Sequence, residues 1–466
     1  MRYIDRSKAY VAKKTTYQLI NLFKNASDES LLRAMGIIGK LAVTSKQRES
    51  VSSFKANLES HPLGLQVLRN FLSREMHPNY YENLVVNFFV QVLLGRGKRR
   101  EILESEGFEP PLLLVISPTM RCNLHCYGCY AGNYKKEDDL PFQVVDGILT
   151  QAKEMGIHFI VFSGGEPFVW DGIWDIFEKH HDMVFQIYTN GTFLNDQNVD
   201  RLAELGNALP AISVEGFKEE TDARRGEGVY DKVMAAMSRL NERKAIFGFS
   251  ATATRQNTDI LCSDEFIDGM VEKGCAIGWF FNYIPIGRAP NLELMPLPEQ
   301  RDKLRQRVRE YRYKKPIFVA DFWNDGPLVG GCIAGGRSYL HINNNGDVEP
   351  CVFAHFAVDN IKEKSLKEAL RSPFFKDIRS RQPYDDNLLR PCMIIDNPWV
   401  LREVVEENNA HPTHPGAESI LSGDIASQLN KYAEEYKPLA DTAWETYTPD
   451  EIWIPKKSPG KSTVLV

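Results

Sequence analysis

The chain has 466 residues, of which 43% are hydrophobic and 25% charged, and a formal net charge of -6 at pH 7. These fractions are ordinary for a globular protein, and the length allows about two or three domains with buried cores. The stretch from Met1 to Ala34 is too polar for a signal peptide, and the most apolar run, Leu84–Leu94, is too short to cross a bilayer. We therefore expect a cytoplasmic protein.

The charge is distributed unevenly, because residues 1–100 are basic and the rest of the chain is acidic. The candidates for a partner of this basic region are a phospholipid surface, an acidic peptide and the acidic remainder of the same chain. A peripheral membrane contact is therefore one alternative. No nucleic-acid-binding motif accompanies the charge, so we expect no nucleic acid partner.

Residues 1–105 are predicted to form an N-terminal helical domain, because apolar residues recur there with helical spacing. Ser27 is a candidate N-cap, and Pro62 and Pro78 stand at helix starts. The basic cluster at 96–100 is typical of a solvated helix end. The expected helices are 8–24, 28–43, 63–75 and 79–95.

Residues 106–295 alternate short apolar strands with amphipathic helices, which predicts parallel β/α units. Six such units would form an α/β fold, a partial (β/α)6 barrel of the TIM type, with its site at the carboxyl ends of the strands. The expected strands are Leu112–Ser117, His158–Ser163, Val184–Tyr188, Ala211–Val214, Phe247–Thr252 and Ile277–Tyr283, and the expected helices are 141–155, 171–181, 196–205, 228–243 and 263–273.

The remaining sequence is predicted as two further regions. Residues 296–400 begin with a helix near 298–313 and continue with Gly-rich turns and three more cysteines, and residues 401–466 hold C-terminal helices and a flexible tail. Helices are expected near 399–408 and 418–437. Eight cysteines without an export signal favour metal ligation over disulfides.

Three cysteines directly follow the first expected strand, in the pattern C-x3-C-x2-C formed by Cys122, Cys126 and Cys129. This spacing lets one loop hold several corners of an iron-sulfur cube. Three thiolates leave one of four irons open to a substrate or cofactor. The alternative is a structural zinc site, which usually takes four ligands in two short pairs.

Glycine-rich turns follow the next two expected strands, Ser163-Gly-Gly-Glu-Pro167 and Tyr188-Thr-Asn-Gly191. Glycine lets the backbone approach a ligand closely, while Glu166 and Asn190 supply polar groups at the same rim. The cysteine pattern, the G-G-E-P turn and their order over 112–288 resemble the radical S-adenosylmethionine (radical SAM) superfamily.

The resemblance implies that the three cysteines hold a [4Fe-4S] cluster whose open iron binds SAM, and that one-electron reduction then yields a 5'-deoxyadenosyl radical. Guanidinium suits bidentate binding of the SAM carboxylate. The implied cofactor-binding residues are Gly164, Gly165 and Glu166 at the methionine amino group, Ser213 and Glu215 at the ribose, Arg225 at the carboxylate, and Asn190 and Ser250 elsewhere in the pocket. The alternative for Arg224 and Arg225 is a solvated pair at a helix start.

One position departs from the family pattern. Family members commonly carry an aromatic residue before the third cysteine to cover the adenine, and this chain has Gly128 there. Tyr127, Tyr130 or the segment 286–287 are the candidates to replace it.

A second cysteine group consists of Cys332, Cys351 and Cys392, and it resembles the SPASM and twitch extensions that hold auxiliary [4Fe-4S] clusters. This resemblance implies an auxiliary cluster with three thiolates and either a non-cysteine ligand or an open iron, for which His355 and Asp385 are candidates. The alternative is buried free thiols. The two other cysteines, Cys262 and Cys275, match no motif and are expected to be buried.

Two carboxylates, Asp321 and Asp325, are the candidate acid/base residues, although an Asp beside a loop Gly is more often part of a turn. Asn282 and Tyr283 end the sixth expected strand near the same region. No Ser-His-Asp arrangement, Walker loop or G-x-G-x-x-G fingerprint appears, so hydrolase, NTPase and nicotinamide chemistries have little support.

We therefore expect a radical SAM enzyme that abstracts hydrogen from a substrate, with a peptide or protein as the first expectation. Two alternatives are a radical SAM enzyme acting on a lipid or isoprenoid at a membrane surface, and a non-catalytic zinc-binding protein. The chemistry implies a reductant protein such as flavodoxin or ferredoxin.

Overall fold

The computed structural model describes residues 27–41, 45–60, 62–85, 87–88, 91 and 94–448. Within these residues, nine strands form one sheet in the order β7-β6-β5-β4-β3-β2-β1-β8-β9. Strands β1 to β7 run parallel to their neighbours, β8 pairs parallel with β1, and β9 pairs antiparallel with β8. The strands are β1 (Leu113–Ile116), β2 (Phe159–Phe162), β3 (Val184–Thr189), β4 (Ala208–Ser213), β5 (Gly248–Ala253), β6 (Ile277–Asn282), β7 (Phe318–Asp321), β8 (His341–Ile342) and β9 (Val348–Glu349).

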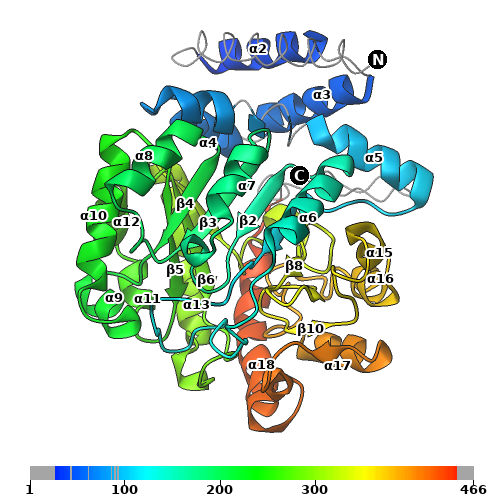
Figure 1. Ribbon diagram of the computed structural model, residues 1–466. Helices are drawn as coiled ribbons and strands as arrows, with labels where there is room; N and C mark the ends of the chain where they lie inside the picture. The colour runs from blue at the N-terminus through cyan, green and yellow to red at the C-terminus, as the bar shows by residue number, and fades with distance from the viewer. Residues whose placement is uncertain are drawn as a thin grey trace.

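The connecting helices lie on the outer face of this curved sheet (Figure 1). Phe177 of α7 packs against Phe185 of β3 with ring centroids 4.9 Å apart. Alternate apolar side chains of a strand face the helices in this way. The helices are α6 (Phe142–Glu154), α7 (Ile173–Lys179), α8 (Asp196–Leu205), α9 (Lys218–Arg225), α10 (Val229–Glu242), α11 (Thr258–Leu261), α12 (Asp264–Glu272) and α13 (Pro298–Lys314), with short turns η3 (Pro167–Val169) and η4 (Leu292–Leu294).

The prediction of a partial barrel is confirmed, with all six expected strands present. The sheet is longer than predicted, because β7 adds to one edge and β8 and β9 add to the other. One detail was wrong: Arg224 and Arg225 lie in the last turn of α9 rather than at a helix start. Nothing in the sequence had marked residues 218–225 as a helix.

The N-terminal helices cover the amino ends of the barrel strands. The side chains of Arg74, Asn83 and Arg99 donate to the carbonyls of residues 274, 205 and 156, each just before a strand, at 2.5, 2.9 and 2.9 Å. The described part of the basic region therefore contacts the protein's own barrel. The elements are α2 (Asp28–Leu41), α3 (Ser45–Ser60), α4 (Pro62–Leu72), η1 (Tyr80–Val85) and α5 (Leu94–Glu106); the expected helix at 8–24 and part of that at 79–95 lie outside the described residues.

The C-terminal region packs beside β8 and α13 (Figure 1). Its centre is Arg301 of α13, which is fully buried, pairs with Asp396 at 2.6 Å and lies 3.8 Å from the ring of Tyr436. The elements are α14 (Gly326–Val329), β10 (Phe356–Ala357), α15 (Leu366–Leu370), α16 (Pro373–Ser380), α17 (Pro398–Glu407), β11 (His411–Pro412), η5 (Ala417–Ile420) and α18 (Gly423–Glu445). None of the helices in the described segments has the length and apolarity needed to span a membrane.

Candidate functional site

The first cysteine set lies in the loop after β1, at the carboxyl end of the strand. Cys122, Cys126 and Cys129 are free thiols and are partly exposed. Two N–H groups approach the Cys122 sulfur, from the backbone of Leu124 at 3.4 Å and from the Asn190 amide at 3.7 Å. Burial raises the pKa of the Cys122 thiol, and Glu166 and the other two thiols add to that rise. Such N–H···S contacts are what cluster thiolates accept, so the loop fits an iron-sulfur cluster.

The backbone of this loop is held by the segment that follows β6. The Arg288 guanidinium donates to the Cys126 carbonyl at 2.9 Å, and the Arg288 backbone N–H donates to the Cys129 carbonyl at 3.0 Å. Gly287 has φ +73, and a Cβ there would lie 2.4 Å from the Cys129 carbonyl oxygen. Sequence reasoning missed Arg288, because nothing local in the sequence connects positions so far apart.

The G-G-E-P turn packs directly against the chain that enters the cysteine loop. The backbone N–H of Gly165 donates to the Thr119 carbonyl oxygen at 3.0 Å, and the backbone N–H of Glu166 donates to the Arg121 carbonyl oxygen at 2.9 Å. A Cβ on Gly165 would lie 2.2 Å from the Arg121 carbonyl oxygen, so no other residue fits there. The turn therefore sets the position of the loop.

The Glu166 carboxylate is buried and connects this turn to the end of β3. It accepts hydrogen bonds from the Thr189 hydroxyl at 2.8 Å and from the Asn190 backbone at 2.7 Å. Burial raises the pKa of Glu166 to about 7, although these donors oppose the rise. Because Asn190 also contacts Cys122, Glu166 helps to place a residue beside the first thiol.

The predicted polar residues of β4 and β5 also meet. Glu215 is 1% exposed and pairs with both Arg224, at 2.7 Å, and Arg225, whose Nε donates at 2.8 Å. Ser213 and Ser250 place their hydroxyls 3.4 Å apart on adjacent strands. Burial would lower the pKa of Arg225, but Glu215, Cys126 and Cys129 raise it.

Gly128 has a structural reason for its identity. Its φ is +61, and a Cβ there would lie 2.6 Å from the ring of Tyr283. Tyr283, at the end of β6, therefore brings an aromatic ring against the loop position where the family usually has one. Two tyrosines were expected from the sequence as substitutes for the missing aromatic residue. Tyr127 is 38% exposed, and the Tyr130 hydroxyl lies 2.6 Å from the Ser163 hydroxyl.

The auxiliary cysteines Cys332, Cys351 and Cys392 come from three separate loops, and Cys332 acts electrostatically on both of the others. Burial raises the pKa of the Cys351 thiol to about 12, with a further contribution from Cys332, and the pKa of Cys392 is raised by burial, Asp396 and Cys332. The Ile394 backbone N–H donates to the Cys392 sulfur at 3.3 Å. Of these cysteines Cys351 is buried and the other two are partly exposed, and the set with its N–H donor fits a second iron-sulfur centre.

The two residues considered as a fourth auxiliary ligand have other partners. His355 lies 2.5 Å from His414 through its Nδ1 and 2.8 Å from the Val352 carbonyl through its Nε2. Asp385 accepts from Arg390 at 2.5 Å. Both residues are thus engaged by groups other than the thiols.

The predicted acid/base residues Asp321 and Asp325 form the turn after β7. Asp321 is 1% exposed and accepts from the Asn324 amide at 2.6 Å, and burial, with Asp325 close by, raises the pKa of its carboxyl to about 6. Asp325 accepts from Arg312 and from the Asp321 backbone N–H at 2.8 Å. Each carboxylate is therefore used by the turn and by Arg312.

A Ser-His-Glu arrangement is present, although none was expected from the sequence. The Ser117 hydroxyl lies 2.7 Å from His341 Nε2, and His341 Nδ1 lies 2.5 Å from Glu349. All three side chains are fully buried, which leaves no access for a substrate. The arrangement instead joins the β8–β9 hairpin of the auxiliary region to the end of β1, just before the cysteine loop.

The inner face of the sheet carries aromatic side chains, here called the inner aromatic cluster. Tyr188, Trp279 and Phe281 are partly exposed and contact one another with ring centroids 5.5 to 6.4 Å apart. Contacts continue through Phe322 and Trp323 to Phe353, and from Phe353 to Tyr130 at 5.6 Å. Since Tyr130 follows Cys129 and Phe353 lies two residues after Cys351, the cluster connects the two cysteine sets.

Two buried polar groups near this cluster have no hydrogen-bond partner among the described residues: the Trp279 indole N–H and the Asn282 amide. A buried donor without a partner is costly in free energy unless a ligand satisfies it. Protein atoms cover the indole N–H, so a substrate acceptor would reach it only after a side-chain movement.

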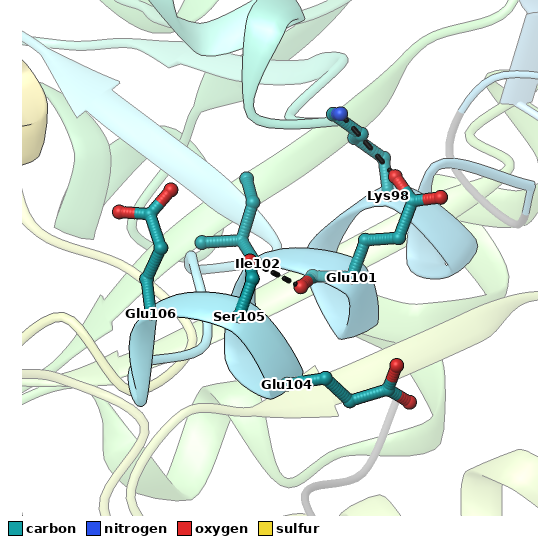
Figure 2. Close-up of a pocket in the computed structure, with 6 residues that line it drawn as sticks. All are labelled: Lys98, Glu101, Ile102, Glu104, Ser105 and Glu106. Atoms are coloured by element: carbon teal, nitrogen blue, oxygen red, sulfur yellow. Dashed lines mark hydrogen bonds and ion pairs between the residues drawn. The ribbon is translucent and has the colours of Figure 1, made fainter.

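A surface depression also lies on α5 (Figure 2). Among the side chains that Figure 2 draws, the Lys98 ammonium donates to the Glu101 carboxylate at 3.2 Å. All lining residues come from this one helix, at the end of the barrel away from the cysteine loop, and we assign it no role. They are Lys98, Glu101, Ile102, Glu104, Ser105 and Glu106.

The cysteine geometry also bears on the zinc alternative. Across the segments that the structure describes, no three His, Cys, Asp or Glu side chains converge closely enough to hold a single metal ion. A structural zinc ion draws four ligands to about 2.0–2.3 Å, whereas a four-iron cube separates its thiolates across its corners. The zinc alternative therefore has no preformed site among the described residues.

Residues 116–251 match the model of the radical SAM superfamily, and residues 332–393 match that of SPASM, an iron-sulfur cluster-binding domain. The mycofactocin maturase MftC of Mycolicibacterium smegmatis is 28% identical over 298 residues, covering 59% of this chain and 74% of the relative. An AdoMet-dependent heme synthase of Oleidesulfovibrio alaskensis is 24% identical over 307 residues, covering 59% and 78%. Streptococcus suis SuiB bound to S-adenosylmethionine shares the fold, with a TM-score of 0.54 and 22% identity over 64% of this chain and 76% of that chain.

Proposed function

Because the chain is a radical SAM enzyme with a SPASM iron-sulfur domain, we propose that it modifies a peptide or protein by abstracting a hydrogen atom from it. The [4Fe-4S] cluster and SAM, when bound, supply the 5'-deoxyadenosyl radical for this step. The protein's own residues bind and orient these groups and the substrate. A one-electron protein reductant such as flavodoxin or ferredoxin would serve the enzyme.

In this proposal the cysteine loop after β1 holds the SAM-binding cluster through Cys122, Cys126 and Cys129. The turn of Gly164 and Gly165 presents backbone groups at the same rim, and Glu166 positions Asn190 beside the Cys122 sulfur. Ser213, Ser250, Glu215 and Arg225 form the polar side of the cofactor pocket, in which the buried Glu215 fixes the guanidinium. Asp321 and Asp325 are the acid/base candidates, although their present partners suit a turn better.

The observation that carries the proposal is the inner aromatic cluster between the two cysteine sets. Partly exposed aromatic rings on an inner sheet face bind apolar or aromatic groups, and the unpartnered Trp279 indole, once a side-chain movement uncovers it, would donate to a carbonyl of the same substrate. A peptide offers both an apolar side chain and a carbonyl. The names of the relatives are compatible with this choice, since MftC is a maturase and SuiB has been solved with a precursor peptide.

A second candidate substrate is a planar macrocycle, because the heme synthase relative and an Fe-coproporphyrin III synthase of Methanosarcina barkeri, 26% identical over 230 residues, are named for such compounds. The same aromatic rings would stack on a macrocycle. The lipid alternative receives less support, because the described basic helices lie at the opposite end of the barrel from the cysteine loop.

The test supplies reconstituted enzyme, SAM and dithionite with peptide, tetrapyrrole and lipid fractions of a uniformly deuterated bacterial extract. Mass spectrometry then measures deuterium in 5'-deoxyadenosine. We expect deuterium transfer from the peptide fraction, with loss of the transfer after protease treatment of that fraction. Transfer from the lipid or tetrapyrrole fraction alone would contradict the peptide assignment.

A further inference from the structure

The chain between β1 and α6, residues 117–140, carries the three core cysteines and is here called the core loop. Its base is closed by the Leu140 backbone N–H, which donates to the Pro118 carbonyl at 2.8 Å. The G-G-E-P turn and the segment after β6 hold the part around the cysteines. Both sides of the core loop also contact the β8–β9 hairpin, residues 341–349, which belongs to the auxiliary region and ends two residues before Cys351.

The hairpin holds the entry to the core loop through an imidazole. The Ser117 hydroxyl lies 2.7 Å from His341 Nε2, and His341 Nδ1 lies 2.5 Å from the Glu349 carboxylate. A carboxylate accepts hydrogen bonds, so the imidazole donates to it through Nδ1. The imidazole therefore connects the residue that follows β1 to Glu349.

The same carboxylate holds the other side of the core loop. Tyr134 comes five residues after Cys129, and its hydroxyl donates to Glu349 Oε1 at 2.7 Å. Tyr134 is 4% exposed and Glu349 is fully buried, so water does not compete for this hydrogen bond. Glu349 is thus connected to the chain on both sides of the core cysteines.

The turn of the hairpin makes a third contact with the core loop. The Asn344 side-chain amide donates to the carbonyls of Lys135 and Asp138, at 2.9 and 2.5 Å. Asn344 is itself buried. The segment that follows Tyr134 is therefore held by the auxiliary region as well.

Glu349 is fixed in turn by two further donors of the auxiliary region. Its Oε1 accepts from the Asn343 amide at 2.9 Å and from the Thr413 hydroxyl at 2.5 Å. With four donors on one buried carboxylate, any rotation of Glu349 would leave buried donors unpaired, which is costly. The auxiliary region therefore sets the position of this carboxylate, and the carboxylate holds the core loop.

We propose that Glu349 is a positioning residue for the SAM site, which fixes the core loop in the geometry that binds SAM. The contacts described for it join side chains to the loop without using an auxiliary thiol, so they persist when the auxiliary cluster is absent. The auxiliary region then has a second task besides holding a cluster. This inference rests on the proposed SAM-binding role of the core loop and does not depend on the substrate.

The first measurement is hydrogen–deuterium exchange of the full chain before reconstitution, so that neither iron nor SAM orders the core loop. Tyr134→Phe removes one hydroxyl from the contact with Glu349. Because opening the loop then breaks one hydrogen bond fewer, we expect exchange in peptides covering 119–140 to be about 10-fold faster. Peptides covering α8 to α12 should exchange as in the unmodified chain.

A matched control removes the same group from another buried tyrosine. The Tyr311 hydroxyl donates to the Ser263 carbonyl at 3.0 Å, on α13 and away from the core loop. Tyr311→Phe should leave exchange in 119–140 unchanged.

The second measurement is the dependence of 5'-deoxyadenosine formation on SAM in the reconstituted chain. Tyr134→Phe should raise KM for SAM about 5-fold and change kcat less than about 2-fold, because it loosens the loop that binds SAM. Glu349→Gln should stay close to the unmodified chain, since its amide oxygen still accepts from Tyr134 and the other tautomer of His341 accepts from its N–H. Glu349→Leu should raise KM further, and adding Tyr134→Phe to it should have no additional effect.

Equal exchange of the core loop in Tyr134→Phe and the unmodified chain would overturn the positioning role. Faster exchange spread over the whole chain would also overturn it, because that result indicates a general loss of stability. An unchanged KM for SAM would do the same. The exchange measurement needs no cluster, SAM or substrate, so failure of the proposed function appears separately, as absence of 5'-deoxyadenosine from the unmodified chain.

Discussion

The two cysteine sets use the same ligand chemistry on different scaffolds. The core set lies in one partly exposed loop at the carboxyl end of β1, with its backbone held by Arg288. The auxiliary set comes from three loops, in which Cys351 is 7% exposed beside Tyr339, while Cys332 and Cys392 are partly exposed like the core thiols. One loop at the carboxyl end of a strand suits a cluster that must meet a small cofactor. We therefore expect the scaffold, rather than the ligand type, to separate the roles of the two sets.

The largest effect should come from breaking the core set. Cys122→Ala should reduce 5'-deoxyadenosine formation by about 1,000-fold or more, because SAM then lacks its one-electron donor. Cys392→Ala should retain SAM cleavage while losing auxiliary iron. The control Cys275→Ala, at a buried cysteine away from both sets, should leave the iron content unchanged. Equal loss of cleavage in Cys122→Ala and Cys392→Ala would remove the distinction between the sets.

The next largest effect should come from the buried charge pair that holds the auxiliary loop. Arg301→Leu leaves Asp396 without its partner, and loss of one member of a buried pair costs about 3–5 kcal/mol. Asp396 also accepts from the Cys392 backbone at 3.0 Å, so auxiliary iron should fall as well. Chemical denaturation and iron analysis would measure both. Lys431→Leu on α18, at an exposed ion pair, should change stability by less than about 1 kcal/mol.

On the core side, Glu166 should make stability depend on pH. Its pKa is raised from 4.5 to about 7 in the folded chain, so the folded state binds the proton more tightly than the unfolded state. The resulting stabilisation is fully present below pH 4.5 and is lost as pH rises through 7, by up to about 3 kcal/mol. The stability difference between the unmodified chain and Glu166→Gln should therefore fall over this window in thermal unfolding. A pH-independent difference would show that Glu166 keeps an ordinary pKa; Glu363→Gln, at an exposed position, is the control.

The smallest effect should come from the inner aromatic cluster between the two sets. Trp279→Phe removes the unpartnered N–H but keeps an aromatic ring. Loss of one hydrogen bond of about 1 kcal/mol should reduce deuterium transfer from substrate about 5-fold. SAM cleavage without substrate should not change. An equal reduction in both reactions would place Trp279 in the cofactor pocket instead.

Sequence patterns predicted the parts of the molecule that are local. The six core strands were predictable because each is a short apolar run followed by a turn, and the core cysteines because they share one loop. Strands β8 and β9 were missed because each has only two residues, and because β8, with which β9 pairs, is held by β1 from far earlier in the chain. For the same reason, nothing in the sequence indicated that His341 of β8 contacts Ser117 or that Glu349 of β9 contacts His341.

Contacts between residues far apart in the chain account for the other omissions. Gly128 looked like a departure from the family pattern, yet Tyr283 fills the space that a side chain there would need. Arg225 and Glu215 were each predicted for the site, but their pairing required α9, which the polar sequence of 218–225 did not indicate. Tyr339 carried no motif, so only its contact with the Cys351 sulfur connects it to the auxiliary centre.

The central claim is that two clusters are present and that only the core cluster meets SAM. The most direct test is EPR of the reduced, reconstituted chain in which Cys332, Cys351 and Cys392 are all replaced by Ala, with and without SAM. We predict one cluster signal that SAM changes, together with 5'-deoxyadenosine formation. If SAM leaves the EPR signal of this variant unchanged, or if the variant forms no 5'-deoxyadenosine, the account is contradicted.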